Sequence, residues 1–149
     1  MTAPEFFLSS TPFLIDLGRL IFRIALGVCF VVHGLGKLGL VGPGNLSGFT
    51  SWLDSLGFPF PALQARAAMF IEVVGGTLLA LGLVTRIAAF FCLGTMLVAV
   101  LVGHKGGGYL ITNDPPGREY ALNLAILMVV LILLGPGRYS LDFLFFSAR

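Results

Sequence analysis

The sequence predicts an all-α integral membrane protein, folded as a four-helix up-down bundle with one short interfacial helix. Its 149 residues are 57% hydrophobic and only 11% charged, a composition outside the range of soluble domains. The mean hydropathy is +0.99. Four long apolar runs are separated by turns rich in glycine and proline. We therefore expect residues 1–149 to form a single transmembrane domain that needs a lipid bilayer, and a net charge of +2 gives no indication of nucleic acid.

The apolar runs define the expected elements in order. The four spans are expected at about residues 13–40, 62–84, 87–103 and 118–134. Between the first two spans, apolar residues recur at helical spacing from Leu46 to Leu56, with serine, threonine and aspartate between them. This pattern predicts a short amphipathic helix that lies in the membrane interface and is anchored by Trp52. The turn at Gly135-Pro136-Gly137 is expected to stop the fourth span.

Glycines mark the expected contact between the first two spans. Gly27 and Gly34 lie on one stripe of the first span, and Gly75 and Gly76 lie in the second. Helices in lipid associate by close packing, which small residues permit. We therefore predict that the glycine pair of the second span packs against the first span, with Gly27 or Gly34 at the contact.

Glu72 is the residue that most needs an explanation, because it interrupts the apolar run of the second span near its middle. A charge at that depth costs at least a few kcal/mol, so Glu72 is expected to face the bundle interior. The up-down order brings other polar groups to the same half of the membrane. The candidate polar pocket comprises His33, Lys37, Glu72, His104, Glu119 and Asn123. The sequence leaves open whether the Glu72 carboxyl is neutral or paired with a cation, and whether it serves chemistry or helix packing.

Several chemistries can be compared for this pocket. Two histidines could ligate a haem, but His104 sits among glycines at a helix end, so haem is disfavoured. The chain offers too few ligands for a zinc or di-metal site, so no metal is expected. A quinone, whose carbonyls accept hydrogen bonds from histidine or lysine, fits better. A proton or solute path through Glu72 is the competing use.

A second polar group follows the fourth span. Arg138 and Asp142 are four residues apart, so they share one face if the tail is helical. Arg86, in the tight turn on the same side, is a further candidate partner for Asp142. We expect these three residues to form a structural clamp and not a catalytic site.

Four stretches of the chain resemble one known family. They are RIALGVCFVVHGLGKL from Arg23 to Leu38, EVVGGTLLALGLVTR from Glu72 to Arg86, GREYALN from Gly117 to Asn123, and GPGRYSLD from Gly135 to Asp142. On these motifs the chain resembles the DoxX family. The resemblance implies four helices in a bacterial-type cytoplasmic (inner) membrane and an association with membrane redox complexes. It supplies no catalytic residues, so these stay unassigned.

Two classes of function follow from the residues and the resemblance. The chain is expected to be a component of a membrane redox system, with quinone as a possible ligand, acting with other redox subunits or as a homo-oligomer. The alternative is a non-catalytic anchor or structural subunit of a larger complex, and transport of protons or small solutes is a third reading. A slight excess of lysine plus arginine, five against four, on the side that carries both termini predicts that the termini are cytoplasmic.

Overall fold

The computed structural model describes residues 10–147, and every regular element among them is helical. The first element, α2, spans Pro12–Lys37. Thr11 caps it, with its side-chain oxygen accepting a hydrogen bond from the Leu14 amide at 3.3 Å. Proline at the first position suits a helix start, because the missing N–H has no partner there. The helix ends before the predicted residue 40 because Gly39 turns to a positive φ of 77°.

The expected short helix is present as α3, which spans Leu46–Ser55. The Asn45 side chain caps it by accepting from the Gly48 amide at 2.8 Å. Gly57 then adopts a φ of 78°, which ends the helix and returns the chain toward the next long stretch. Leu53 is the buried residue of α3.

The second long stretch is one continuous helical run made of three parts. It consists of α4 (Pro61–Phe70), the π-helical turn η1 (Ile71–Gly75) and α5 (Gly76–Leu81). Gly82, at a φ of 68°, ends it. Glu72 therefore lies inside the π-helical turn, a local widening of the helix that is often found at functional sites.

The remaining helices follow at short intervals. They are α6 (Thr85–Val98), the π-helical turn η2 (Ala99–Gly103), α7 (Glu119–Leu134) and the six-residue α8 (Leu141–Phe146). Two described stretches are long and apolar enough to cross a membrane, Pro61–Leu81 and Thr85–Gly103, whereas the apolar helix Glu119–Leu134 is shorter. The all-helical class is thus confirmed, and the four-span membrane bundle stays a prediction.

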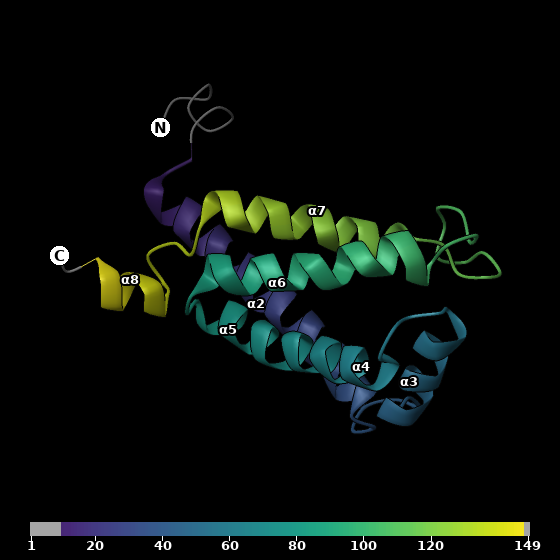
Figure 1. The fold of residues 1–149 in the computed structure, drawn as a ribbon. Coiled ribbons are helices and arrows are strands. Elements are labelled where there is room, and N and C mark those ends of the chain that lie inside the picture. The colour runs from purple at the N-terminus through teal and green to yellow at the C-terminus, as the bar shows by residue number, and fades with distance from the viewer. Residues whose placement is uncertain (1–9, 148–149) are drawn as a thin grey trace.

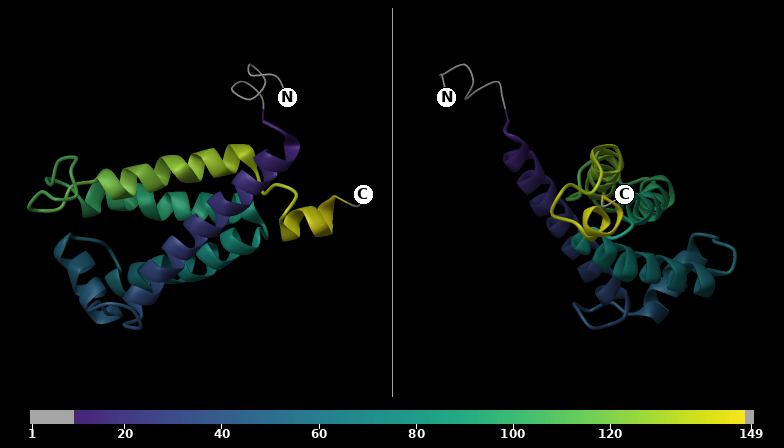
Figure 2. Two further views of the ribbon diagram at one scale, coloured as in Figure 1. Left: turned by 180° about the vertical axis from the view of Figure 1, so that it is seen from behind. Right: turned by 90° about the vertical axis from the view of Figure 1, so that its left-hand side faces the viewer.

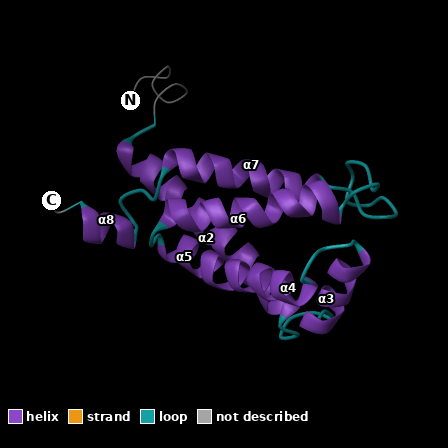
Figure 3. Cartoon of the chain, in the orientation of Figure 1, coloured by secondary structure: helices purple, strands orange, loops and turns teal. Residues whose placement is uncertain are grey.

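The helices alternate in direction along the chain (Figure 1). α6 and α7 lie side by side, and α2 runs obliquely across the other helices, as the reverse and end-on views show (Figure 2). The start of α2, the turn before α6 and helix α8 lie at one end of the molecule. Helix α3 and the loop between η2 and α7, the longest loop drawn in Figure 3, lie at the other end.

Glycines set the closest approach between helices. A Cβ on Gly27 would lie 2.5 Å from the Gly76 carbonyl oxygen, and one on Gly76 would lie 2.7 Å from the Gly27 carbonyl oxygen. The backbones of α2 and α5 therefore touch. Gly34 lies against Val73 in the same way, whereas Gly75 faces the Cys92 sulfur of α6. Gly75 and Gly76 therefore contact different helices, so that the η1–α5 stretch is packed between α2 and α6.

Candidate functional site

A cavity of about 730 Å³ lies between α2, α3, the α4–η1 stretch and α6, and part of α7 closes it. Its walls are mostly apolar and rich in aromatic rings: Phe30, Phe49, Trp52, Phe58, Phe90 and Phe91. Phe90 and Phe91 lie on the outer face of α6 and are 64% and 53% exposed. Because they line the cavity and are also exposed, the cavity opens sideways along α6. Such an apolar pocket with few polar groups is the usual form of a small-molecule site.

An ion pair forms one polar point of the cavity. The Lys37 ammonium lies 2.6 Å from Glu72 Oε2, and the two side chains are only 18% and 5% exposed. Lys37 stands at the last turn of α2, and Glu72 comes from the π-helical turn η1. The ammonium also lies 4.8 Å from the centre of the Phe49 ring of α3. The buried Glu72 carboxyl is therefore paired with a cation from the neighbouring helix.

A hydrogen-bonded chain of three side chains forms the second polar point. The Tyr120 hydroxyl lies 2.5 Å from His33 Nε2 and 2.9 Å from Cys29 Sγ. Cys29 and His33 are one turn apart on α2, so both reach the first turn of α7. Of the three, His33 and Tyr120 line the cavity. Tyr120 was not among the residues predicted for the pocket, since a tyrosine in an apolar helix carries no signal of its own.

The two polar points share a helix. His33 and Lys37 are four residues apart on α2, so they lie on one face, one turn from each other. A planar molecule in the cavity could therefore meet an ammonium group near one end and a histidine–tyrosine pair near the other. Together the two polar points bring one carboxylate, that of Glu72, to the cavity. No group of three metal-ligating side chains occurs within residues 10–147.

Of the other three residues predicted for the pocket, one lines the cavity and two do not. His104 lines the cavity, and its Nδ1 lies 3.0 Å from the Pro116 carbonyl oxygen. Glu119 instead accepts a hydrogen bond from the Ile111 amide at 3.2 Å, and Asn123 is exposed. Neither of these two residues lines the cavity.

The geometry of α7 explains this outcome. Successive residues turn by about 100° around the axis. Tyr120, Ala121 and Leu124 form the face of α7 that lines the cavity. Glu119 and Asn123 fall outside this face, although each is next in sequence to a lining residue, Tyr120 or Leu124. Depth alone, which sequence analysis used, does not decide which side of a helix a residue occupies.

At the opposite end of the molecule, the three residues of the predicted clamp contact other partners. Asp142 accepts hydrogen bonds from the Val84 amide at 2.6 Å, the Thr85 amide at 2.9 Å and the Thr85 hydroxyl at 2.7 Å. It thereby caps the start of α6. The expected ion pairs of Asp142 with Arg138 or Arg86 do not form within the described part of the chain. Arg86 donates instead to the Ile132 carbonyl at 3.0 Å.

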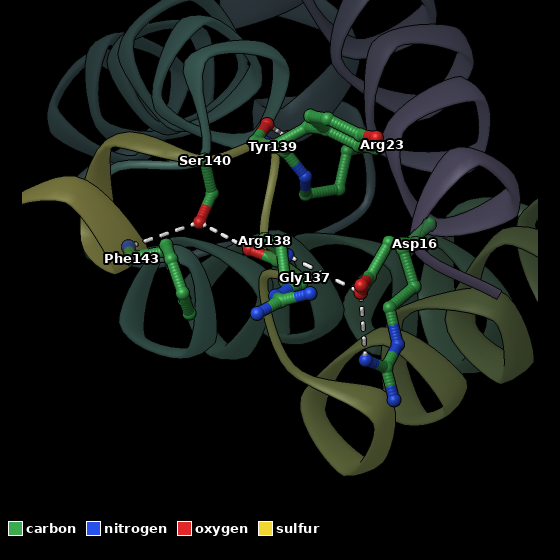
Figure 4. Close-up of polar contacts among 8 residues, drawn as sticks. Asp16, Arg23, Gly137, Arg138, Tyr139, Ser140 and Phe143 are labelled. Carbon is green, nitrogen blue, oxygen red and sulfur yellow. Dashed lines mark hydrogen bonds and ion pairs between the residues drawn. The ribbon is translucent and has the colours of Figure 1, made fainter. Parts of the chain in front are cut away.

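Arg23 completes this end of the fold. Its side chain is fully buried and donates to the Leu79 and Ala80 carbonyls at 3.2 Å, and also to the Tyr139 carbonyl. Figure 4 shows Arg23 beside Tyr139, and Asp16 reaching the backbone of Arg138. Arg23 thus ties α2 to the end of α5 and to the segment before α8. These contacts are structural, and they lie at the opposite end of the molecule from α3 and the cavity.

The comparisons with known proteins give one family and several relatives. The family model DoxX matches residues 18–105. "Uncharacterized membrane protein Rv3486" of Mycobacterium tuberculosis is 30% identical over 131 residues, which cover 80% of this chain and 76% of that protein. "Inner membrane protein YphA" of Escherichia coli is 32% identical over 129 residues, covering 83% and 86%.

One further relative has a name that refers to an activity. "Putative oxidoreductase CatD" of Bacillus subtilis is 31% identical over 86 residues, which cover 58% of this chain and 59% of that protein. No solved structure matches the chain. Together with the two apolar stretches that could cross a bilayer, the names of the relatives support a membrane location. The chain belongs to the DoxX family of membrane proteins.

Proposed function

We propose that this protein is a component of a membrane redox system and that its cavity binds a quinone. The observation that carries the proposal is the combination of an apolar, aromatic cavity with two hydrogen-bonding points on one face of α2. A quinone has a flat apolar ring, which aromatic walls accommodate. Its two carbonyl oxygens are acceptors, and Lys37 and the His33–Tyr120 pair are the matching donors.

The sideways opening supports a ligand that arrives from the lipid. The cavity reaches the exposed aromatic residues of α6, Phe90 and Phe91, which would face acyl chains in a bilayer. A membrane quinone carries a long apolar tail, and such a tail could remain in this opening while the ring lies inside. A small polar solute would gain nothing from these walls, so the transport reading is disfavoured.

We propose the membrane arrangement as part of the same account. In it, α2, the α4–η1–α5 stretch, the α6–η2 stretch and α7 cross the inner membrane as four spans, with both termini in the cytoplasm. Their alternating directions support it (Figure 1). At about 1.5 Å per residue, the 16 residues of α7 give a length of about 24 Å, slightly short of a hydrocarbon core of about 30 Å. Local thinning of the bilayer, or polar ends that reach the headgroups, would accommodate such a helix.

The chemistry that the chain supplies in this role is the handling of protons. Reduction of a quinone to the quinol takes up two electrons and two protons. A redox subunit that docks to this chain would supply the electrons. The Tyr120 hydroxyl, which is held by His33, can donate one proton to the quinone, and the phenolate that remains takes up a proton from solvent through the His33 ring. Lys37, which is paired with Glu72, can deliver the other proton, and the carboxylate stabilises the ammonium that is restored by proton uptake.

The experiment that tests the proposal is analysis of the bound lipids. The protein is purified from native membranes in a mild detergent, and the organic extract is examined for quinones by mass spectrometry. We expect close to one quinone for each chain. Tyr120→Phe keeps the ring but removes the hydroxyl, and we expect it to retain less quinone. Tyr109→Phe, at an exposed tyrosine in the loop before α7, is the matched control and should retain the parental amount.

The anchor reading predicts a different result. In that case the protein co-purifies with a larger oxidoreductase, its extract contains no quinone, and Tyr120→Phe behaves as the parent does. That combination would contradict quinone binding.

A further inference from the structure

A second hollow lies at the end of the molecule that carries the start of α2 and helix α8. Its volume is about 490 Å³. Its walls come from α2, from the segment after α7 and from α8, and they include Asp16, Arg19, Arg138, Phe143 and Phe146. It is separate from the aromatic cavity, with which it shares no lining residue. The lining combines two arginines, two aspartates and two phenylalanines.

The carboxylates of this hollow already have partners. Asp16 Oδ1 accepts from the Arg19 guanidinium at 3.2 Å and from the Arg138 amide at 3.2 Å. Both oxygens of Asp142 accept from the start of α6. Their negative charges are therefore balanced by an arginine in one case and by the positive end of a helix in the other.

The guanidinium groups have unused donors. Arg138 is exposed, and its guanidinium makes no hydrogen bond or ion pair with residues 10–147; it lies 5.8 Å from the centre of the Phe143 ring. The Nε of Arg19 is buried without a hydrogen-bond partner in the same part of the chain. In Figure 4, the Arg138 guanidinium lies between Phe143 and Asp16. The hollow thus presents a positive charge that no described carboxylate neutralises.

We propose that this hollow binds the phosphate group of an anionic phospholipid. Arginine donates two parallel hydrogen bonds to a phosphate, so the exposed guanidinium of Arg138 matches this group, and Arg19, whose Nη1 is paired with Asp16, lines the same hollow. Phe143 and Phe146 are exposed by 41% and 66%, and they would contact the glycerol and the upper acyl chains. A free phosphate ion would use the guanidinium groups only and would leave the phenylalanine rings exposed to water. The shape of the hollow therefore favours a lipid over the free ion.

The position of the hollow agrees with this ligand. α8 follows directly after the turn that ends α7, and its four phenylalanine and leucine side chains from Phe143 to Phe146 are exposed. A short apolar helix at the end of a membrane span can lie in the interface, where phospholipid phosphates are found. Basic residues at that level attract anionic lipids.

The test uses the full chain in detergent and measures bound lipid by native mass spectrometry. The probe is phosphatidylglycerol, with phosphatidylcholine and inorganic phosphate as comparisons. We expect retention of phosphatidylglycerol, weaker retention of phosphatidylcholine, and no effect of inorganic phosphate at the same concentration. Arg138→Gln should weaken phosphatidylglycerol binding about fivefold, the effect of one arginine near a charged surface. Arg66→Gln, at an exposed arginine of α4, is the matched control and should bind as the parent does.

Three results would overturn the proposal. The first is equal phosphatidylglycerol binding by Arg138→Gln and the parent. The second is an equal loss in the Arg66→Gln control, which would indicate non-specific attraction. The third is full competition by inorganic phosphate, which would indicate an anion site without a lipid. Quinone content, measured on the same samples, is expected to be unchanged in Arg138→Gln, so this test is independent of the proposed redox role.

Discussion

At the scale of single residues, two buried cations have opposite roles. Arg23 is fully buried and donates only to backbone carbonyls, among them those of Leu79 and Ala80 at the end of α5. Its charge is therefore stabilised by the carbonyl oxygens at a helix end. Lys37 is partly buried and pairs with the carboxylate of Glu72 at the wall of a cavity. A charge that is removed from water is stable only with such partners. Because the partners differ, replacing the two cations should have different consequences for stability and for binding.

Replacement of Arg23 should lower the stability of the fold. Arg23→Met keeps the length of the side chain but leaves the part-buried Ala80 and Tyr139 carbonyls without this donor, at a cost of about 1 kcal/mol for each acceptor. Arg19→Met, one turn earlier, removes a partly exposed ion pair worth less than about 1 kcal/mol. The free energy of unfolding in detergent without added phospholipid measures both. Equal losses in the two variants would show that Arg23 is not a tie between helices.

Residue positions could be predicted from the sequence only in part. Glu72 was predictable as a buried group because a carboxylate within an apolar run must find a partner. Its pairing with Lys37 was one of several possibilities, because the sequence gives no relative rotation of α2 and the π-helical turn. Tyr120 was missed because a tyrosine in an apolar helix is ordinary. Asn123 was included in the predicted pocket because its depth along the helix was inferred without the side of the helix that it occupies. Asp142 was expected to pair with arginines because a carboxylate that caps backbone amides has no clear sequence pattern.

At the scale of elements, glycines and π-helical turns shape the packing. Gly27 and Gly76 bring the backbones of α2 and α5 into contact, a feature that the small-residue pattern made predictable. The π-helical turns η1 and η2 were not predictable, because they arise from packing and not from a local motif. Both adjoin the cavity. η1 holds Glu72, and a Cβ on Gly103 of η2 would lie 3.0 Å from the Trp52 ring of α3.

Substitution at the contact of α2 and α5 should be destabilising only where the backbone is crowded. A Cβ on Gly27 would lie 2.5 Å from the Gly76 carbonyl oxygen, so Gly27→Ala should cost about 1–3 kcal/mol through overpacking. Gly18 is on the same helix and has no atom within 4 Å of an added Cβ. Gly18→Ala should therefore stabilise α2 by up to about 1 kcal/mol. Melting temperatures in detergent measure both variants, and a shift of the same sign in the two would refute the close contact.

The cap on α6 gives a second prediction at this scale. Asp142→Ala removes the acceptor for the Val84 and Thr85 amides, and the loss of such a cap costs about 0.5–2 kcal/mol. Asp54→Ala, at an exposed residue of α3, should change stability much less. Thermal unfolding checks the difference. Both variants should bind quinone as the parent does, and loss of quinone by Asp142→Ala with an intact fold would show that the clamp has a functional role.

At the scale of the whole molecule, the two proposed binding sites lie toward different ends. The start of α2 and helix α8, which line the second hollow, lie at one end, and α3, which lines the aromatic cavity, lies at the other (Figure 1). The helical class and the order of helices followed from hydropathy and turns. The cavity did not, because its volume depends on the oblique crossing of α2, which does not appear in a one-dimensional pattern.

The proposed four-span arrangement predicts which residues share a side of the membrane. Single cysteines are introduced as Ser10→Cys, Lys105→Cys and Ser147→Cys in a background carrying Cys29→Ser and Cys92→Ala. In intact cells, a membrane-impermeant maleimide should label the cysteine at 105 from outside. The cysteines at 10 and 147 should react only after the cells are opened. Labelling of 10 and 147 from opposite sides would contradict an even number of spans.

The measurement that tests quinone binding most directly uses the single tryptophan of the chain. Trp52 lines the cavity and is also 41% exposed, so saturable quenching, and not quenching as such, reports on binding in the cavity. Quinones quench the fluorescence of a nearby indole. Titration of the purified protein with a short-chain ubiquinone in detergent should give saturable quenching with one site, and Tyr120→Phe should weaken the affinity. A tryptophan derivative that is free in the same micelles should show only gradual quenching without saturation. If Trp52 is quenched in the same unsaturable way, the cavity does not bind quinone.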